Sequence, residues 1–523
     1  MLKKILNIKL KVVAIVVISL MVIQLITGYI FGFVAQKQID AQFKYFTDSP
    51  LIKVVGRQYK RGVFSSDITT ELTLNSNATA NLLKILPKGQ ESEVLNNIYS
   101  IKYITHVQHG LFAGVLHGNF LPTLAYSSTV VEYPENLKKL LDKFFNGKDP
   151  LQITDVLYLN KSGKLTAYSP TFNYEEAVSG VKVKWGGLNL DIKYNDKFTK
   201  FTNKLKVPSF ELIAPTHGQV ILNNLNYASD SKYSVNNIKV GDTNLDIDLI
   251  KIEWNDKVAL NFKLGDVLRM VTRINSVEFL NSIDVINPNS FTFNKIAYNS
   301  VSSDENNFFK AEASAKFESL VTNKRLYGPM HLDVSVDHVL APQFSILIDK
   351  IEQFAVKANN ESNVAETNSD TKAEFIKLLK DNFGPILVNK PEVVISRLEL
   401  KTPNGLIKLK GNATTNNFEL SDMNDNGKFM DKIFVDFNFS IPKPVVAYLF
   451  VLQMKYLLSA GNAEMDQQSS EALTKVVNIL LDSQISTWTS KGYIKNNNGQ
   501  LESHMVYKDG KLVINNIPTK SAQ

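Results

Sequence analysis

Apolar and polar residues alternate with a period of two along much of this chain, and this pattern constrains its fold more than any other feature. The most regular example has apolar residues at Ile433, Val435, Phe437, Phe439 and Ile441, with Asp436, Asn438 and Ser440 between them. Because successive side chains of a β-strand point to opposite faces, such segments predict strands with one apolar face. Similar segments lie at residues 64–74, 181–194, 245–249 and 332–336.

Turn residues separate these segments. Gly62 precedes the first of them, and Asn498-Gly499 and Asp509-Gly510 punctuate the last hairpin, predicted over residues 492–516. The pair Gly186-Gly187 interrupts another alternating segment and switches its parity, which indicates either a β-bulge or a tight turn. The sequence therefore predicts a mainly β fold with minor α, a long and curved antiparallel sheet assembly with a few packing helices.

Helical patterns are few. Residues 134–146 begin with proline and an acidic residue and stop before Gly147, as expected of a short amphipathic helix. Four further helices are predicted over residues 341–357, 370–382, 445–460 and 470–490, the last two as a C-terminal helical pair.

An uncharged apolar segment, Val12–Ala35, lies close to the N-terminus. As a helix it would extend about 36 Å, against a hydrocarbon core of about 30 Å, so we expect a transmembrane anchor. Lysines at positions 3, 4, 9 and 11 precede it, which predicts a cytoplasmic N-terminus and a large exported remainder. A cleaved signal peptide is the less favoured alternative, since the run is long and lacks a small-x-small site; it would export the same domain.

Composition excludes several classes of function. The 523 residues include no cysteine, which rules out disulfides, thiolate metal sites and cysteine nucleophiles. The net charge of +7 suits anionic lipid head groups, but the lysines form no dense basic block, so we expect no nucleic-acid partner.

These features predict the following organisation. The expected parts are a cytoplasmic basic N-terminus (1–11), a transmembrane anchor (12–35), a stalk (36–50), a first β-rich region (51–358), a polar linker (359–370), and a second β-rich region with the C-terminal helical pair and closing hairpin (371–523).

Several short motifs, in this order, resemble one protein family. They are Tyr59, Arg61, Gly62, Phe64 and Ser66; His109-Gly110; Trp185-Gly186-Gly187-Leu188; Gly328-Pro329 with Leu332-Asp333; and Gly510 to Asn515. The chain resembles the YdgA-like proteins of Gram-negative bacteria, which carry a domain of unknown function. The resemblance implies a protein anchored in the bacterial inner membrane with its bulk in the periplasm. The family continues its His-Gly step with proline, whereas Leu111 follows here. The resemblance assigns no functional role to these residues.

No catalytic, cofactor-binding or metal site can be assembled from the sequence. Residues 422–427 resemble the start of a calcium loop, but Ile433 occupies the twelfth position, where glutamate is required, so a solvated turn is expected. His106, His109 and His117 have no carboxylate nearby in sequence; we expect them in turns and keep an envelope hydrolase as the least favoured hypothesis.

Two non-enzymatic functions remain as hypotheses. In the first, an apolar sheet face of this membrane-anchored envelope protein binds or handles a lipid or another amphiphile. In the alternative, the chain is an oligomeric scaffold or assembly factor for an inner-membrane complex, acting through its sheet edges and C-terminal helices. Gly28 and Gly32 form a G-x-x-x-G pair that would let two anchor helices approach closely, as in a homo-oligomer.

Overall fold

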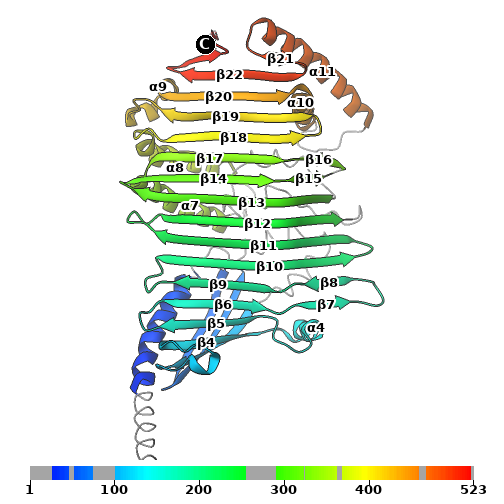
Figure 1. The fold of residues 1–523 in the computed structure, drawn as a ribbon. Helices are drawn as coiled ribbons and strands as arrows, with labels where there is room; N and C mark the ends of the chain where they lie inside the picture. Colours follow the sequence, from blue (N-terminus) through cyan, green and yellow to red (C-terminus); the bar gives the residue numbers. More distant parts are fainter. Residues whose placement is uncertain are drawn as a thin grey trace, which may run out of the picture. The chain divides into compact units, whose positions relative to one another are not determined.

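The computed structural model describes residues 26–45, 47, 52–74, 101–254, 290–322, 324–361, 368–458 and 467–519. The chain divides into two compact units, Met1–Thr216 with Asn223–Lys232 (unit 1) and His217–Leu222 with Tyr233–Gln523 (unit 2). Each is built on antiparallel strands, as Figure 1 shows, which confirms the mainly β prediction. The division falls within strand β11 (Gly218–Tyr233).

The sheet of unit 1 follows the chain order of its main strands. It consists of β1 (Ile52–Arg61), β2 (Ser65–Leu74), β3 (Ile101–His109), β4 (Thr123–Glu132), β5 (Gln152–Tyr158), β6 (Gly163–Ser169), β9 (Leu188–Tyr194) and β10 (Lys200–Ala214), each paired antiparallel with the next. Short strands β7 (Phe172–Glu175) and β8 (Lys182–Trp185) form a hairpin, and β8 also pairs with β10. Helix α4 (Glu135–Phe145) confirms the predicted amphipathic helix.

The paired glycines form neither a tight turn nor a bulge. The same number of residues, 186–188 on one side and 207–209 on the other, separates the two paired segments, so neither strand has an extra residue. Strands β8 and β9 lie along the same partner, with Trp185 opposite Phe210 and Asn189 opposite Lys206. Gly187 has a φ of 87°, which favours glycine. The parity switch in the sequence therefore marks the interruption between β8 and β9, which pair with the same strand, β10.

A helix over residues 26–45 packs on the sheet of unit 1, where the sequence predicts the end of the anchor and a stalk. Ala35 is fully buried in a cluster with Val107 of β3 and Leu157 of β5. The positions buried along this helix recur about every fourth residue, as expected of one helical face on a sheet. Residues 36–45 are therefore part of the folded unit 1, whereas the sequence predicted a stalk there.

Most of the predicted membrane anchor lies outside the residues that the structure describes. Its first part, residues 12–25, and the N-terminal residues 1–11 lie outside the described residues. Within the described ranges, no helix combines the length and the apolar character required to span a bilayer.

Unit 2 is likewise built on antiparallel sheet. Its main strands, in order, are β12 (Lys239–Trp254), β13 (Ser290–Glu305), β14 (Phe308–Phe317), β17 (Met330–Leu340), β18 (Glu392–Thr402), β19 (Gly405–Thr415), β20 (Ile433–Pro442), β22 (Gln500–Lys508), β23 (Lys511–Ile514) and β24 (Ile517–Pro518). Three short strands pair at its margins: β15 (Ser319–Thr322) with β13, β16 (Arg325–Tyr327) with β15, and β21 (Lys495–Asn497) with β22.

Two helical pairs lie on one face of this sheet, behind the strands in Figure 1. They are α7 (Ala341–Glu361) with α8 (Asn368–Leu387), and α10 (Lys443–Leu458) with α11 (Gln467–Ser490), close to the predicted ranges. The polar segment 359–370 joins α7 to α8 inside unit 2, so the division between units lies elsewhere, within residues 217–233.

Candidate functional site

Seven of the motif residues gather where the helix 26–45 meets the sheet of unit 1, and we call this region the helix seat. Tyr59 packs against the cluster that buries Ala35, and the Arg61 guanidinium lies 3.4 Å from the centroid of the Phe33 ring. The remaining members are Gly62, Phe64, Ser66, His109 and Gly110. The sequence contained these residues as separate motifs; strand pairing brings them together.

Glycines let the helix approach the sheet closely. A Cβ at Gly32 would lie 2.8 Å from Nδ1 of His109, and one at Gly28 would lie 2.8 Å from the ring of Phe64. Real Cβ atoms do not approach other atoms so closely, so a side chain at either position would require the helix or the facing ring to shift. The G-x-x-x-G pair therefore contacts the protein's own sheet, and it no longer supports pairing of two anchor helices.

A hydrogen-bonded serine and histidine lie beneath this helix. Oγ of Ser66 and Nε2 of His109 are 3.0 Å apart, and both residues are buried. Burial lowers the pKa of His109; a hydrogen bond to the Val63 backbone opposes this effect and the charge of Arg61 adds to it. The neutral imidazole has the contacts of a packing group, and Gly32 covers it, so the pair lacks the exposure that attack on a substrate requires.

A buried carboxyl group holds the other end of the helix. Tyr194 of β9 donates to Asp155 of β5 at 2.9 and 3.0 Å, and Nε2 of Gln42 donates to Oδ2 of Asp155 at 3.0 Å. Burial raises the pKa of Asp155 to about 6, although both hydrogen bonds oppose the shift. Gln38 adds a hydrogen bond to the backbone oxygen of Asp196 at 2.8 Å. Sequence reasoning missed this group, because the two glutamines of the helix lie more than 100 residues from their partners on and beside the strands.

The remaining motif residues shape the backbone. Nε1 of Trp185 donates to Oγ of Ser169 at 2.9 Å, beside the strand interruption at Gly186-Gly187. Gly328 has a φ of 107°, and its N–H and the carbonyl of Pro329 both bond to Lys401 of β18.

At the C-terminal hairpin, Gly510 has a φ of 70° in the β22–β23 turn. Nδ2 of Asn515 donates to the carbonyls of Gly492 and Tyr493, and its Oδ1 accepts from N of His504. Asp333 lies on the polar face of β17, where its carbonyl accepts from Ser396. These residues do not converge on the helix seat.

The other histidines do not converge with His109. His106 lies on the opposite face of β3 and pairs with Asp67 at 2.6 Å, while His117 stacks on Tyr126 with ring centroids 4.0 Å apart. In the calcium-like segment, Asp422 accepts from N of Glu419 and Asp425 caps helix α9 (Asn426–Asp431). Within the described residues no group of three potential metal ligands is found.

Unit 2 carries a continuous apolar face. The register places Leu332 of β17 opposite Leu398 of β18, Leu398 opposite Leu409 of β19, and Leu409 opposite Phe439 of β20. All four are only half-buried. Toward β14 and β17 the pair α7 and α8 covers this face around Val339, and toward β22 the pair α10 and α11 covers it around Leu501. An apolar strip lies between the two covered regions.

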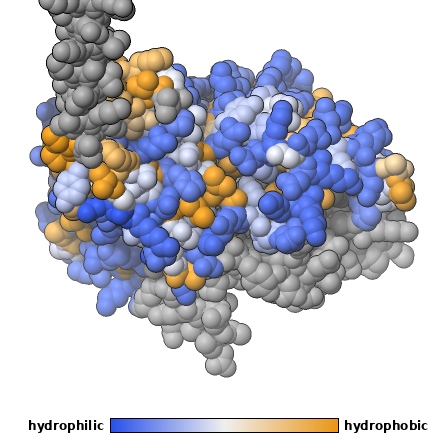
Figure 2. Space-filling view, turned by 90° about the horizontal axis from the view of Figure 1, so that it is seen from below, coloured by the Kyte–Doolittle hydropathy of each residue, from blue (hydrophilic) through white to orange (hydrophobic). Residues whose placement is uncertain are grey.

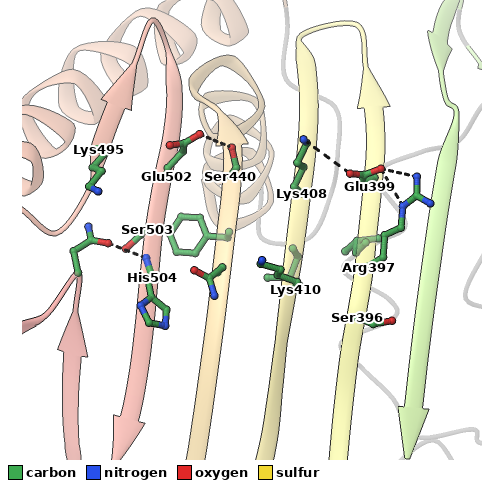
Figure 3. Close-up of a pocket in the computed structure, with 15 residues that line it drawn as sticks. Ser396, Arg397, Glu399, Lys408, Lys410, Ser440, Lys495, Glu502, Ser503 and His504 are labelled. Carbon is green, nitrogen blue, oxygen red and sulfur yellow. Dashed lines mark hydrogen bonds and ion pairs between the residues drawn. The ribbon is translucent and has the colours of Figure 1, made fainter. Parts of the chain in front are cut away.

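The opposite face of the same strands holds a groove of about 450 Å³, shown in Figure 3, whose lining includes polar residues and atoms of Leu398, Leu409 and Phe439. Its charged side chains are Arg397, Glu399, Lys408, Lys410, Lys495, Glu502 and His504. Glu399 accepts from Arg397 at 2.7 and 3.0 Å, and Glu502 accepts from Ser440 at 3.3 Å. Lys408 also forms an ion pair with Glu399, so three of these groups pair with one another, as is common on a solvated sheet face.

One acid–base pair in this groove was missed by sequence reasoning. Nε2 of His504 on β22 lies 2.8 Å from Oδ1 of Asp436 on β20. The nearby hydroxyl of Ser440 donates to Glu502 and accepts from Gln500, which leaves the pair without a positioned nucleophile. Only the strand register, with Asn438 opposite His504, could have revealed it.

Comparison with known proteins gives one match. A family model described as "Bacterial protein of unknown function (DUF945)" matches residues 8–520. No curated protein and no solved structure matches the chain. The resemblance to the YdgA-like proteins, with the anchoring that it implies, stays a prediction.

Proposed function

The chain belongs to the bacterial family of unknown function DUF945, and we propose that it is a non-enzymatic, membrane-anchored envelope protein that binds lipid acyl chains along the apolar face of unit 2. Its N-terminal segment spans the inner membrane once, and its bulk lies in the periplasm. The observation that carries the proposal is the strip of half-buried apolar side chains in register across β17 to β20.

The chemistry of the strip favours acyl chains over a polar ligand. Leucine and phenylalanine side chains offer no hydrogen-bond donors or acceptors, and burying them stabilises by about 25 cal/mol per Å² of apolar surface removed from water. The helical pairs cover the apolar face at the borders of the strip, and the charged side chains lie on the opposite face.

Photocrosslinking of the full chain tests this function. The protein is reconstituted into vesicles of phosphatidylethanolamine and phosphatidylglycerol that contain a trace of phospholipid with a diazirine near the acyl-chain end. After illumination, mass spectrometry identifies the labelled peptides. We expect labelling within β17 to β20, and a several-fold loss of labelling at β19 in Leu409→Gln.

Lys408→Gln is the matched control, because Lys408 neighbours Leu409 on the same strand and points to the polar face. Its labelling should equal that of the wild type. Labelling that is confined to residues before 36 and absent from β17 to β20 would refute acyl-chain binding while leaving the anchor intact.

Exposed apolar residues on the C-terminal helices favour a second function, a scaffold that docks a protein of the same membrane. Leu449 of α10 and Ile479 and Leu480 of α11 are more than half exposed. The pair is otherwise fixed, since Lys443 forms an ion pair with Asp482 and Leu481 and Ile485 are buried against Leu501. Crosslinking in membranes that captures one discrete protein with the wild type, and loses it with Ile479→Glu, would favour this alternative.

A further inference from the structure

Exposed apolar side chains surround the end of the helix seat at which the helix 26–45 begins. Val63 and Phe64 form the β1–β2 turn, and Phe112, Phe120 and Leu121 belong to the β3–β4 connection; we call these five residues the apolar rim. Phe120 is 81% exposed and Leu121 is 61% exposed. Figure 2, which looks at the protein from below, shows hydrophobic residues in patches among hydrophilic ones.

The rim lies at one end of the strands. N of His109, the last residue of β3, donates to the carbonyl of Phe64 at 2.7 Å, so the turn and the start of the connection are adjacent. The connection is held in place: N of Thr123 donates to the carbonyl of Leu111 at 3.1 Å, and His117 stacks on Tyr126. The exposed side chains are therefore presented on a fixed backbone.

The helix beside the rim changes character along its exposed side. Ile26, Tyr29 and Ile30 are more than half exposed, whereas beyond Phe33 the exposed positions are Lys37, Ala41 and Lys44. Gly28, on the inner side of the same turn, contacts Phe64 of the rim. At the level of the rim, then, the helix is apolar on both sides; one turn beyond Phe33 its outer side is polar.

The sequence before this helix indicates what covers the rim. Residues 12–25, VVAIVVISLMVIQL, are uncharged, and they join the helix at the end where the rim lies. Lys60 and Arg61 are exposed in the strand that leads to the turn. Aromatic residues with flanking basic residues are typical of the membrane–water interface, where the basic side chains meet anionic lipid head groups.

We infer that the apolar rim is a membrane-seating surface: Phe112, Phe120 and Leu121, with the turn Val63-Phe64, insert into the interface of the bilayer that the N-terminal segment enters. The inference rests on the membrane anchoring in the proposed function. Seating fixes the helix seat, and with it unit 1, against the lipid surface, where a tethered domain would otherwise rotate freely.

Single cysteines test the seating, because the natural chain has none. Phe120→Cys and Leu121→Cys are labelled with an environment-sensitive nitrobenzoxadiazole dye in the full chain, reconstituted into vesicles of phosphatidylethanolamine and phosphatidylglycerol. Val178→Cys is the control, since Val178 is a 98% exposed apolar residue in the β7–β8 turn of the same unit. We expect a blue-shifted emission at positions 120 and 121, quenched by brominated lipid and protected from aqueous iodide at least threefold relative to position 178.

Equal iodide quenching at all three positions in vesicle-bound protein would overturn the seating and leave the anchoring intact. Protection from iodide without quenching by brominated lipid would also overturn it, because a protein surface would then cover the rim. If the full chain does not float with the vesicles at all, the anchoring itself fails, so the two failures are distinguishable.

Discussion

At the scale of single residues, the buried carboxyl group of Asp155 gives unit 1 a distinct pH dependence. Its pKa is about 6 in the folded protein and close to 3.8 when unfolded, because burial disfavours the charged form. A raised pKa stabilises the fold below the unfolded pKa, and this contribution is lost as the pH rises through about 6. The shift of roughly two units corresponds to about 3 kcal/mol.

We therefore expect Asp155→Asn to remove a decrease in stability between about pH 4 and pH 6.5. Asparagine keeps an acceptor for Tyr194, and the amide of Gln42 can rotate to accept from it. The measurement is the free energy of urea unfolding of the full chain in detergent, at several pH values. Parallel pH profiles for the wild type and the variant would show that Asp155 does not titrate in this range.

His109 acts with the opposite sign. Its pKa is lowered mainly by burial, so its contribution is present above the ordinary value of 6.5 and is lost as the pH falls. Both groups lie under the helix 26–45. Unit 1 should be most stable at the pH where neither ionisation of Asp155 nor protonation of His109 destabilises the fold appreciably. Neither residue could be placed by sequence reasoning, because burial follows from the packing of the helix and not from local pattern.

At the scale of elements, the helix 26–45 depends on the glycines that face the sheet. Gly32→Val places atoms where His109 lies, so the helix must move outward, at a cost of about 1–3 kcal/mol. We expect faster hydrogen exchange at the amides of residues 33–45 in this variant. Ala41→Val is the control, because position 41 is exposed on the same helix.

Unchanged exchange in Gly32→Val would mean that the helix does not rest on His109. The sequence predicted an anchor helix up to residue 35 with a stalk after it, and it offered the glycine pair as a contact between two helices. The structure assigns that pair to the sheet, because the strands bring Phe64 and His109 to the two glycines. Two glycines four residues apart indicate that another element packs closely against the helix, but they do not indicate which element it is.

At the scale of the whole molecule, each compact unit has its own buried clusters. Unit 1 has the cluster around Ala35 and Leu157, and unit 2 has those around Val339 and Leu501. Leu157→Ala should remove about 2–5 kcal/mol by leaving a cavity in unit 1. Because the effect of a cavity is strongest in the cooperative unit that contains it, we expect loss of protection mainly in unit 1 peptides.

Hydrogen exchange with mass spectrometry measures this effect in both units of the same sample. Equal loss of protection in both would mean that they unfold as one, and that the division by contacts has no thermodynamic counterpart. The corresponding cavity in unit 2, Leu501→Ala, should reverse the pattern.

The sequence by itself determined that the fold is mainly β, and it located several of the strands and helices. The period of two placed the strands, as at Ile433 to Ile441, and caps and glycines placed the helices, since both signals come from neighbours along the chain. Only the tertiary structure decided which strands pair, where the two units divide, and which side chains meet in the helix seat. Ser66 and His109, or Asp155 and Gln42, lie 43 and 113 residues apart, and such contacts depend on register and packing, for which one sequence carries no local signal.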